Sequence, residues 1–452
     1  MKYKFIAKIP VLLFILSLFL PFSISAQGGD KLMFIRDAEI EFALQTYSRP
    51  ILKAAGLPPE NVSIIIVQDP SLNAFVAEGM NIFIHTGLIS ESEDPLVLTG
   101  VIAHEVGHIA GGHLIRKNEA YSQAILSTAL SYVLGAASIA AGSSDAGAAI
   151  ITGGQHIAHR NILSHSRIQE QSADQAALNF LERSELSAKG LLSLLEKLGS
   201  RETLFYNDID PYTLTHPLSQ DRISHIRNHL ISSPTADIAV PESWKILQQR
   251  IVAKIKAFLD DPQKTLAAYP ESDNSVKARY ARSIAYHKKG ELALAIKEID
   301  ALLEQSPEDP YFNELKGQIL FENGKVDESI TYYRKSSKII PETPILKFQL
   351  AASLVASNDK RNLPEAISLL NEVVVKNSKD VGAWHLLGIA YGKNEQIGMS
   401  YLALAEEASI VGKKEEALDF IKRAEPLFEE KDPALLRARD IRKFLELKIE
   451  KK

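Results

Sequence analysis

The sequence predicts an α+β chain that is mostly helical, with a small edge sheet near its amino terminus and an α-solenoid in its second half. Runs rich in β-branched residues are concentrated between residues 62 and 85. Helical apolar spacing is common elsewhere, and a 34-residue period is present after residue 276. At 452 residues the chain is too long for one ordinary core, so two or three domains are expected.

The composition narrows the class of protein. Hydrophobic residues make up 46% and charged residues 24% of the chain, which are the proportions of a globular protein. The net charge is −5 and no long basic run occurs, so nucleic-acid binding has little support. The chain has no cysteine, which excludes a lipobox, a disulfide framework and thiolate metal ligands.

Residues 1–26 have the pattern of a secretory signal peptide. Three lysines precede an apolar run at residues 11–20, and small residues lead to a predicted cleavage site after Ala26. The apolar run is too short for a comfortable membrane span, and an uncleaved anchor is the alternative interpretation. We therefore expect the chain to be exported.

Three short segments predict the small sheet. Residues 62–67 are rich in β-branched side chains, residues 73–79 have the pattern of a strand and a turn, and residues 81–85 that of a further strand. An amphipathic helix is expected within residues 27–50. The segment from Asn73 to Val76 is either an ordinary core strand or an edge strand that binds an extended peptide.

A predicted helix over residues 95–114 carries the most informative motif, H-E-x-x-H. Asp94 is the expected N-cap of this helix. His104 and His108, four residues apart, share one helix face and can bind one zinc ion. Glu105 lies where its carboxylate can reach metal-bound water, so the motif indicates zinc-dependent hydrolysis.

A catalytic zinc ion needs a third protein ligand and one open position. Glu170, which lies 62 residues beyond His108 on a predicted helix, is the best candidate, and a surface glutamate is the alternative. Asp174 lies one helical turn further and could accept the free N–H of a ligand histidine. The sequence therefore predicts one Zn²⁺ per chain with a His₂Glu ligand set.

The second half of the chain is repetitive. Gly290 and Gly324 are 34 residues apart, as are Pro307 and Pro341. Residues 384–391 read W-H-L-L-G-I-A-Y and match the W-x2-L-G-x2-Y signature of tetratricopeptide repeats, whose period is about 34 residues. Repeats of this kind usually bind extended peptides on a concave surface.

Three motifs together resemble the gluzincin metallopeptidases of the HtpX and BepA kind. They are N-A-F-x-x-x-G from residue 73, H-E-x-x-H from residue 104 and S-R-x-x-E-x-x-A-D from residue 166. The repeats narrow the resemblance to the BepA type, the periplasmic branch linked to quality control of outer-membrane protein assembly. The resemblance covers the chain from about residue 30 onward.

The resemblance implies a role for each matching residue. His104, His108 and Glu170 fall on the zinc ligands of the family, Glu105 on its general base, and Asp174 on the acid that supports a ligand. The family also has an arginine after a similar H-P loop.

Arg222 matches that arginine, and it is either a surface arginine or the group that stabilises the oxyanion. His216, in the loop Thr215-His216-Pro217, is either an ordinary turn residue or a fourth zinc ligand that displaces the catalytic water and makes the enzyme latent. Four other histidines are expected to be mostly solvated or helix-capping, namely His113, His156, His159 and His165.

Residues 120–144 contain no charged side chain and consist largely of Ala, Ser, Gly and Leu. Their length could span a bilayer, but small and hydroxyl residues make insertion weak. A helical hairpin beside the active site is the preferred interpretation, and a lid in peripheral contact with a membrane is the alternative.

The sequence thus predicts four segments: a signal peptide (1–26), a zinc metallopeptidase domain (27–232), a connecting helical linker (233–275) and a tetratricopeptide repeat domain (276–452). The resemblance implies a periplasmic endopeptidase that hydrolyses misfolded or stalled outer-membrane proteins. Its repeats would bind clients or assembly components, with chaperone-like activity as a further implication. The alternative is a repeat-based scaffold with a largely latent protease site.

Overall fold

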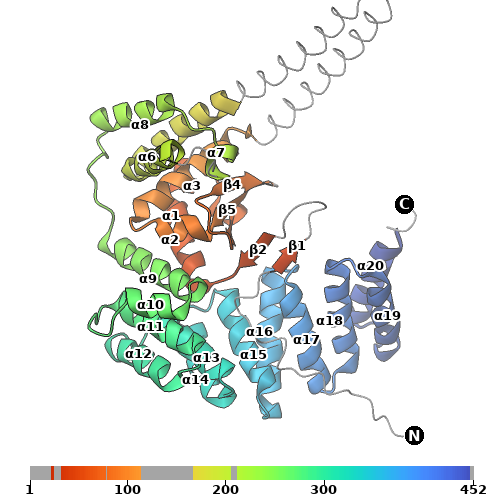
Figure 1. Ribbon diagram of the computed structural model, residues 1–452. Helices are drawn as coiled ribbons and strands as arrows, with labels where there is room; N and C mark the ends of the chain where they lie inside the picture. Colours follow the sequence, from red (N-terminus) through yellow and green to blue (C-terminus); the bar gives the residue numbers. More distant parts are fainter. Residues whose placement is uncertain (1–21, 25–31, 78, 114–165, 205–210, 448–452) are drawn as a thin grey trace, which may run out of the picture. The chain divides into compact units, whose positions relative to one another are not determined.

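The computed structural model shows two compact units, which are described separately. The first ends at Leu259 and the second begins at Asp260. The structure describes residues 22–24, 32–77, 79–113, 166–204 and 211–447 (Figure 1).

The first unit contains a small sheet with the strand order β1-β2-β3-β5-β4. Its strands are β1 (Phe22–Ile24), β2 (Leu32–Ile35), β3 (Ser63–Val67), β4 (Ala74–Ala77) and β5 (Asn81–His85). β3 and β5 are parallel and the other neighbours are antiparallel. β1 lies within the predicted signal peptide, so the predicted mature chain keeps the four strands from β2 onward. The predicted strands at residues 62–67, 73–79 and 81–85 are confirmed, and β4 forms one edge of the sheet.

Helices pack on one face of this sheet. The helices of the unit are α1 (Ala38–Ala54), α2 (Thr86–Glu91), α3 (Pro95–Ala110), a helix over 166–183, α6 (Lys189–Leu204), α7 (Pro211–Thr215), α8 (Gln220–Ser232) and α9 (Glu242–Leu259). Side chains two residues apart point to the same face of a strand, so Ile82 and Ile84 of β5 lie together. They join Leu44 of α1 and Val101 of α3 in one buried core. The helix expected within residues 27–50 begins only at Ala38, because β2 precedes it.

The backbones of α3 and α6 approach each other closely. A Cβ atom on Gly190 of α6 would lie 2.0 Å from the carbonyl oxygen of Leu96 on α3. Only glycine allows this approach, which fixes the start of the motif-bearing helix against its neighbour.

Helix α9 belongs to the first unit. Its Trp244 ring lies 5.0 Å from the Tyr47 ring of α1, and its buried Lys254 pairs with Asp37 at 2.6 Å. The sequence placed this helix in a connecting linker over residues 233–275, whereas these contacts make it part of the first unit. The boundary between the two units accordingly falls after Leu259.

The second unit consists of stacked helix pairs, as the period predicted. Its helices are α10 (Pro262–Ala268), α11 (Val276–Lys288), α12 (Leu292–Gln305), α13 (Pro310–Glu322), α14 (Val326–Ile339), α15 (Pro344–Ala356), α16 (Leu363–Lys376), α17 (Val381–Lys393), α18 (Ile397–Ile410), α19 (Lys414–Ala424) and α20 (Pro433–Leu447). Gly290 and Gly324 have φ values of 76° and 77° in the turns within the first two pairs. Such positive φ values favour glycine, which explains the 34-residue recurrence of this residue.

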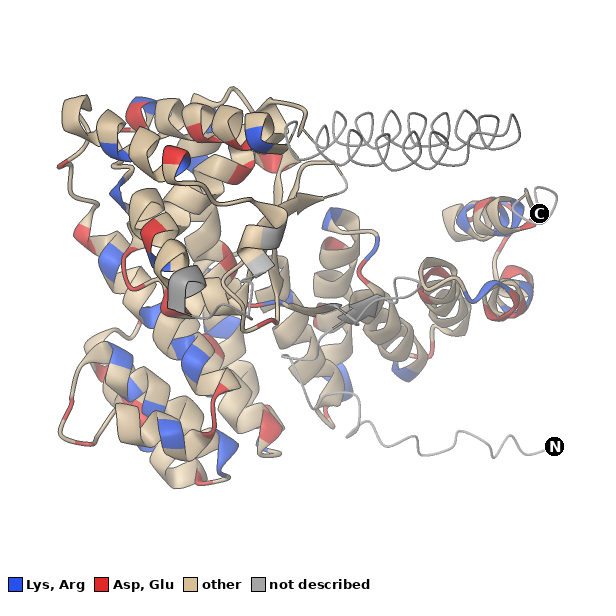
Figure 2. Cartoon of the chain, turned by 45° about the horizontal axis from the view of Figure 1, so that its top comes forward, with Lys and Arg blue, Asp and Glu red and all other residues tan. Residues whose placement is uncertain are grey.

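The described helices carry a mixed surface. In Figure 2 the acidic and basic residues are interspersed along the described helices. None of the described helices is long and apolar enough to cross a membrane. The predicted hairpin or lid at residues 120–144 lies outside the described residues.

Candidate metal centre

Helix α3 places the two histidines of the H-E-x-x-H motif side by side. Asp94 caps the helix by accepting a hydrogen bond from the Leu96 N–H, as the sequence predicted. His104 is fully buried, and its Nε2 lies 3.1 Å from Nε2 of His108. The two nitrogens therefore face the same point, which is the requirement for shared coordination.

The helix over residues 166–183 brings Glu170 to the same point. Its Oε2 lies 3.2 Å from Nε2 of His104, and its Oε1 lies 3.3 Å from Nε2 of His108. Gly107 makes this approach possible, because a Cβ atom there would lie 2.7 Å from the carbonyl oxygen of Ala173. A glycine inside the motif thus lets the two helices meet closely enough for the three groups to converge.

His216 is the fourth member of this cluster. It is buried at the end of α7, and its Nδ1 lies 3.3 Å from both Nε2 of His104 and the Glu170 carboxylate. Each of these three residues and His108 offers one ligand atom, and the four atoms all lie within 4.8 Å of one another.

The donor set fits a zinc ion. Imidazole nitrogens and a carboxylate oxygen are its usual ligands, and four of them match its tetrahedral preference. Glu105 supplies independent support, since both of its buried oxygens lack a hydrogen-bond partner among the described residues. Nε2 of His216 lies 3.5 Å from Oε1 of Glu105 without forming a hydrogen bond. A buried carboxylate without hydrogen bonds is costly, and metal-bound water would supply the missing donor.

Asp174 supports His104 from behind. Its Oδ1 lies 2.9 Å from Nδ1 of His104, which leaves Nε2 directed at the cluster. Burial alone would lower the pKa of His104, but hydrogen bonds with Asp174 and Glu170 overcome this effect and raise that pKa to about 10. Burial alone would raise the pKa of Asp174, but His104 and Arg222 lower it to about 2. A carboxylate that orients a ligand histidine in this way is the usual arrangement around zinc.

Arg222 is fully engaged by neighbouring groups. Its Nε and Nη2 donate to Asp174 at 2.7 and 2.9 Å, and its Nη1 lies 3.0 Å from Glu170 and donates to the Pro217 carbonyl at 3.1 Å. These contacts orient the carboxylates of Asp174 and Glu170. The oxyanion role expected from the sequence would require some of these bonds to break.

The sequence interpretation missed the role of two residues. His113 was expected to be solvated or helix-capping, yet it is buried, and its Nδ1 lies 3.0 Å from Nδ1 of His108. Gly112, with a φ of 62°, reverses the chain after α3 and returns His113 to the centre. Tyr212 is also buried, and its ring lies 4.7 Å from that of His216. The sequence signals available were the positions of His113, five residues after His108, and of Tyr212, four residues before His216.

The centre adjoins the edge of the sheet. Nε2 of His216 lies 3.1 Å from the carbonyl oxygen of Ala74 on β4, and the Thr215 hydroxyl lies 3.2 Å from the Asn73 side-chain oxygen. The His85 N–H donates to the Asn73 carbonyl, so the backbone of Asn73 faces β5. In an antiparallel pair, successive residues direct their N–H and carbonyl groups to opposite sides of the strand. The N–H and carbonyl of Ala74 therefore point to the open side of β4. Helix α7 therefore covers the start of an edge strand.

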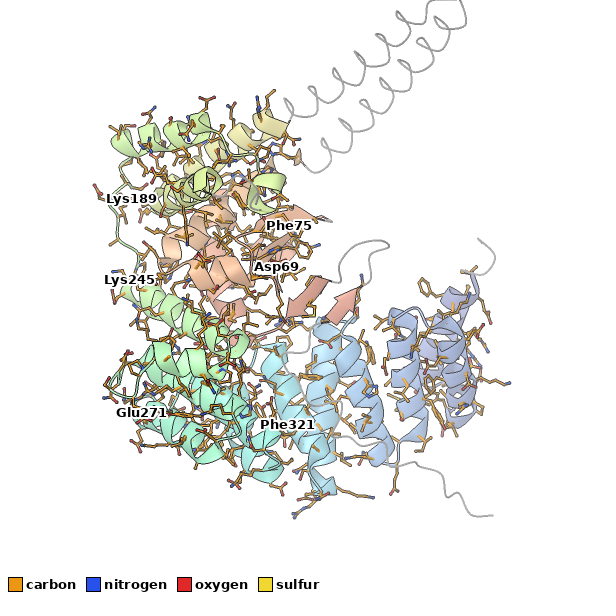
Figure 3. All side chains as sticks on the ribbon, in the orientation of Figure 1. Asp69, Phe75, Lys189, Lys245, Glu271 and Phe321 are labelled. Atoms are coloured by element: carbon orange, nitrogen blue, oxygen red, sulfur yellow. The ribbon has the colours of Figure 1, made fainter. Side chains whose placement is uncertain are left out.

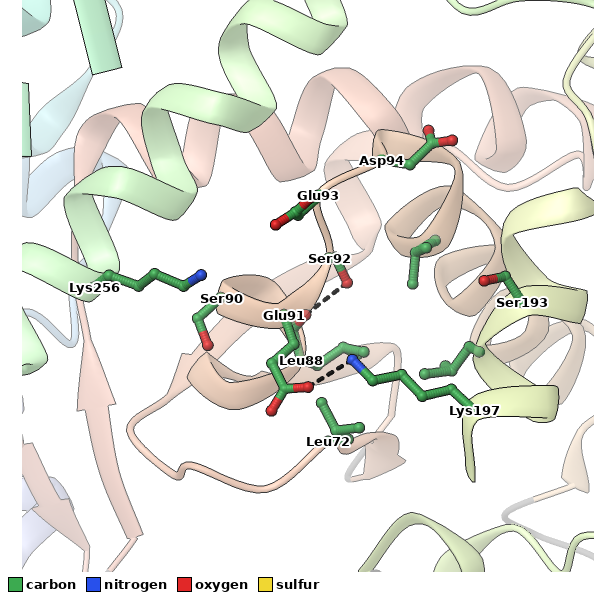
Figure 4. Close-up of a pocket in the computed structure, with 12 residues that line it drawn as sticks. Leu72, Leu88, Ser90, Glu91, Ser92, Glu93, Asp94, Ser193, Lys197 and Lys256 are labelled. Atoms are coloured by element: carbon green, nitrogen blue, oxygen red, sulfur yellow. Dashed lines mark hydrogen bonds and ion pairs between the residues drawn. The ribbon is translucent and has the colours of Figure 1, made fainter. Parts of the chain in front are cut away.

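A separate cavity lies away from this centre. It is lined by residues of α2, α3, α6 and α9 and of the segment between α2 and α3, among them Leu88, Asp94, Lys197 and Lys256 (Figure 4). The Lys197 ammonium crosses it to pair with Glu91 at 2.6 Å. None of the metal-centre residues lines it, so it takes no part in the chemistry of the metal centre.

Comparison with known proteins agrees with the two-part organisation. Residues 39–230 match peptidase family M48, and residues 280–342 match a tetratricopeptide repeat family. A beta-barrel assembly-enhancing protease of Escherichia coli K12 is 25% identical over 365 residues, which cover 79% of this chain and 73% of that protein. The corresponding protease of Yersinia pestis is also 25% identical, with 79% and 74% covered. Metalloprotease LoiP of Escherichia coli K12 is 26% identical over 46% of this chain and 77% of its own.

Proposed function

We propose that this chain, a metalloendopeptidase with an M48 domain and tetratricopeptide repeats, degrades misfolded or stalled outer-membrane proteins in the periplasm. The predicted signal peptide supports export, and the beta-barrel assembly-enhancing proteases among its relatives support the substrate class. The repeats would bind clients or components of the assembly machinery. The buried group of His104, His108, Glu170 and Glu105 is the observation that carries the enzymatic part of the proposal.

In this proposal His104, His108 and Glu170 hold the zinc ion. Bound zinc would polarise the scissile carbonyl and lower the pKa of its water to about 7. Glu105 accepts the proton of the attacking water and passes it to the leaving amide nitrogen. Asp174 fixes the orientation of His104, and Arg222 holds Asp174 in place through two hydrogen bonds.

The substrate would bind as an extra strand along β4. The outward N–H and carbonyl of Ala74 offer main-chain hydrogen bonds that do not depend on substrate sequence. This mode suits an unfolded client, whose backbone is extended and accessible. The edge ends beside the metal centre, as shown by the contact between His216 and Ala74.

His216 would regulate access to the centre. Its ring lies close enough to supply a fourth ligand, which would exclude the catalytic water and keep the enzyme latent. The same observation favours a second candidate function, a repeat-based chaperone or scaffold whose protease site is mostly idle. Client folding or assembly that persists in Glu105→Gln would support that second function as an independent role.

The test compares zinc content and casein cleavage in the wild type and in Glu105→Gln. We expect one zinc per chain in both proteins, and cleavage that falls by about 10²- to 10⁴-fold in the variant because its general base is lost. Glu93→Gln, at an exposed glutamate just before α3, is the matched control and should behave like the wild type. A chain that binds no zinc would overturn the peptidase mechanism.

A further inference from the structure

The sheet of the peptidase unit has a second face, which carries aromatic residues. Side chains alternate between the faces of a strand, so Phe75 of β4 and Phe83 of β5 point away from the helix-covered core that contains Ala74 and Ile84. Phe34 of β2 lies on the same side as these rings. All three are only partly buried, whereas Ala74 and Ile84 are fully buried.

The aromatic rings form a continuous row that ends at the open edge. The Phe34 and Phe83 centroids are 6.2 Å apart, and those of Phe83 and Phe75 are 5.0 Å apart with nearly parallel planes. Phe75 is paired with Phe83 in the strand register, and it lies on β4, the edge strand. Figure 3 labels Phe75 on this strand.

A peptide strand added to β4 would extend this row. Directly opposite residues on one face of a sheet lie about 4.5–5.5 Å apart, so one substrate side chain would stand beside Phe75. Aromatic and β-branched partners are favoured at such a position, whereas a charged or small side chain gains little there. Main-chain bonds to Ala74 would give affinity without selecting a sequence, and Phe75 would add the selection.

We propose that Phe75, backed by Phe83 and Phe34, is a specificity-determining surface that selects an aromatic or large aliphatic substrate side chain on the outer face of the added strand. The class of substrate is therefore an unfolded, extended segment with an aromatic or large aliphatic side chain opposite Phe75. This inference rests on the proposed function, since it requires peptide hydrolysis at the adjoining centre.

The test uses quenched-fluorescence peptides of 12 residues in which one Phe is moved along a Ser/Thr background, with an all-Ser/Thr peptide as reference. The full chain is used, in the His216→Ala background, so that latency does not mask the comparison. We expect one Phe position to raise kcat/KM by about 2- to 12-fold, the size of an aromatic pair contact. Phe75→Ser should reduce this ratio to near one.

Two variants serve as controls. Phe42→Ser removes an exposed phenylalanine from α1 and should leave the ratio unchanged. Phe75→Trp keeps an aromatic surface and should keep the preference, which provides a reading if Phe75→Ser does not fold. The inference is overturned if the Phe75→Ser protein keeps the preference for Phe, or if the Phe75→Trp protein loses it. The proposed function itself is rejected if the His216→Ala protein cleaves the peptides no faster than the same protein with Glu105→Gln added.

Discussion

Nε2 of His216 lies 3.1 Å from the carbonyl oxygen of Ala74, while Nδ1 of the same ring lies 3.3 Å from the Glu170 carboxylate. One imidazole thus contacts both the edge strand and the candidate metal cluster. A peptide that pairs with the Ala74 carbonyl would compete with this contact. In the proposed function, this ring would couple substrate binding to the opening of the centre.

Replacing His216 with alanine should raise proteolysis. Without the ring, the Ala74 carbonyl and the fourth position of the cluster are both accessible. If the closed state is favoured by about 1.4 kcal/mol, about one molecule in ten is open, and the variant should cleave casein about tenfold faster. Initial rates of casein cleavage at equal zinc loading measure this effect.

The control for that variant is His225→Ala, which removes an exposed histidine of α8. It should cleave casein at the wild-type rate. Proteolysis that is unchanged or lower in His216→Ala would show that His216 is not a latch, and a lower rate would point to a direct role in catalysis.

Arg222→Lys distinguishes a positioning role of Arg222 from an oxyanion role. Lysine keeps the positive charge but cannot reproduce the paired hydrogen bonds to Asp174. If Arg222 positions Asp174, zinc affinity should fall by about 10- to 100-fold, as for other residues that support metal ligands. Competition with a chelating dye measures the affinity. An unchanged affinity together with a large fall in kcat would instead assign Arg222 to the oxyanion.

His113 should contribute to zinc binding although it is not among the four clustered ligands. With Nε2 of His108 turned to the cluster, Nδ1–H of His108 is the donor and Nδ1 of His113 the acceptor of their 3.0 Å contact. His113→Phe should weaken zinc binding by about tenfold, and His113→Gln should recover part of the loss because its amide oxygen can accept this bond. Equal zinc affinity in wild type and His113→Phe would exclude this role.

Zinc affinity should fall as the pH is lowered. The pKa of His104, raised to about 10 by the carboxylates of Asp174 and Glu170, keeps its ring protonated near neutral pH, so zinc must displace one proton. Between pH 8 and pH 6, the release of this one proton should lower the apparent zinc affinity about tenfold for each unit of pH decrease. Zinc titrations at three pH values test this, and a flat profile would contradict it.

Local patterns in the sequence predicted much of the architecture. The H-E-x-x-H spacing placed His104 and His108 on one face of a helix, because a helix returns to the same face after four residues. Strand and repeat periods likewise predicted β3 to β5 and the helix pairs from α11 onward. These features depend on interactions between residues that are close in sequence, so a single sequence suffices to read them.

The tertiary structure decided which distant groups meet. The closeness of Glu170 to His108 depends on a helix-to-helix approach through Gly107, and the orientation of Arg222 toward Asp174 depends on the packing of α8. The return of His113 to the centre and the contact between His216 and Ala74 also arise from folding. Neighbour spacing fixes which residues share a helix face or a strand face, but close packing of separate elements fixes the distances on which coordination, ligand orientation and latency depend.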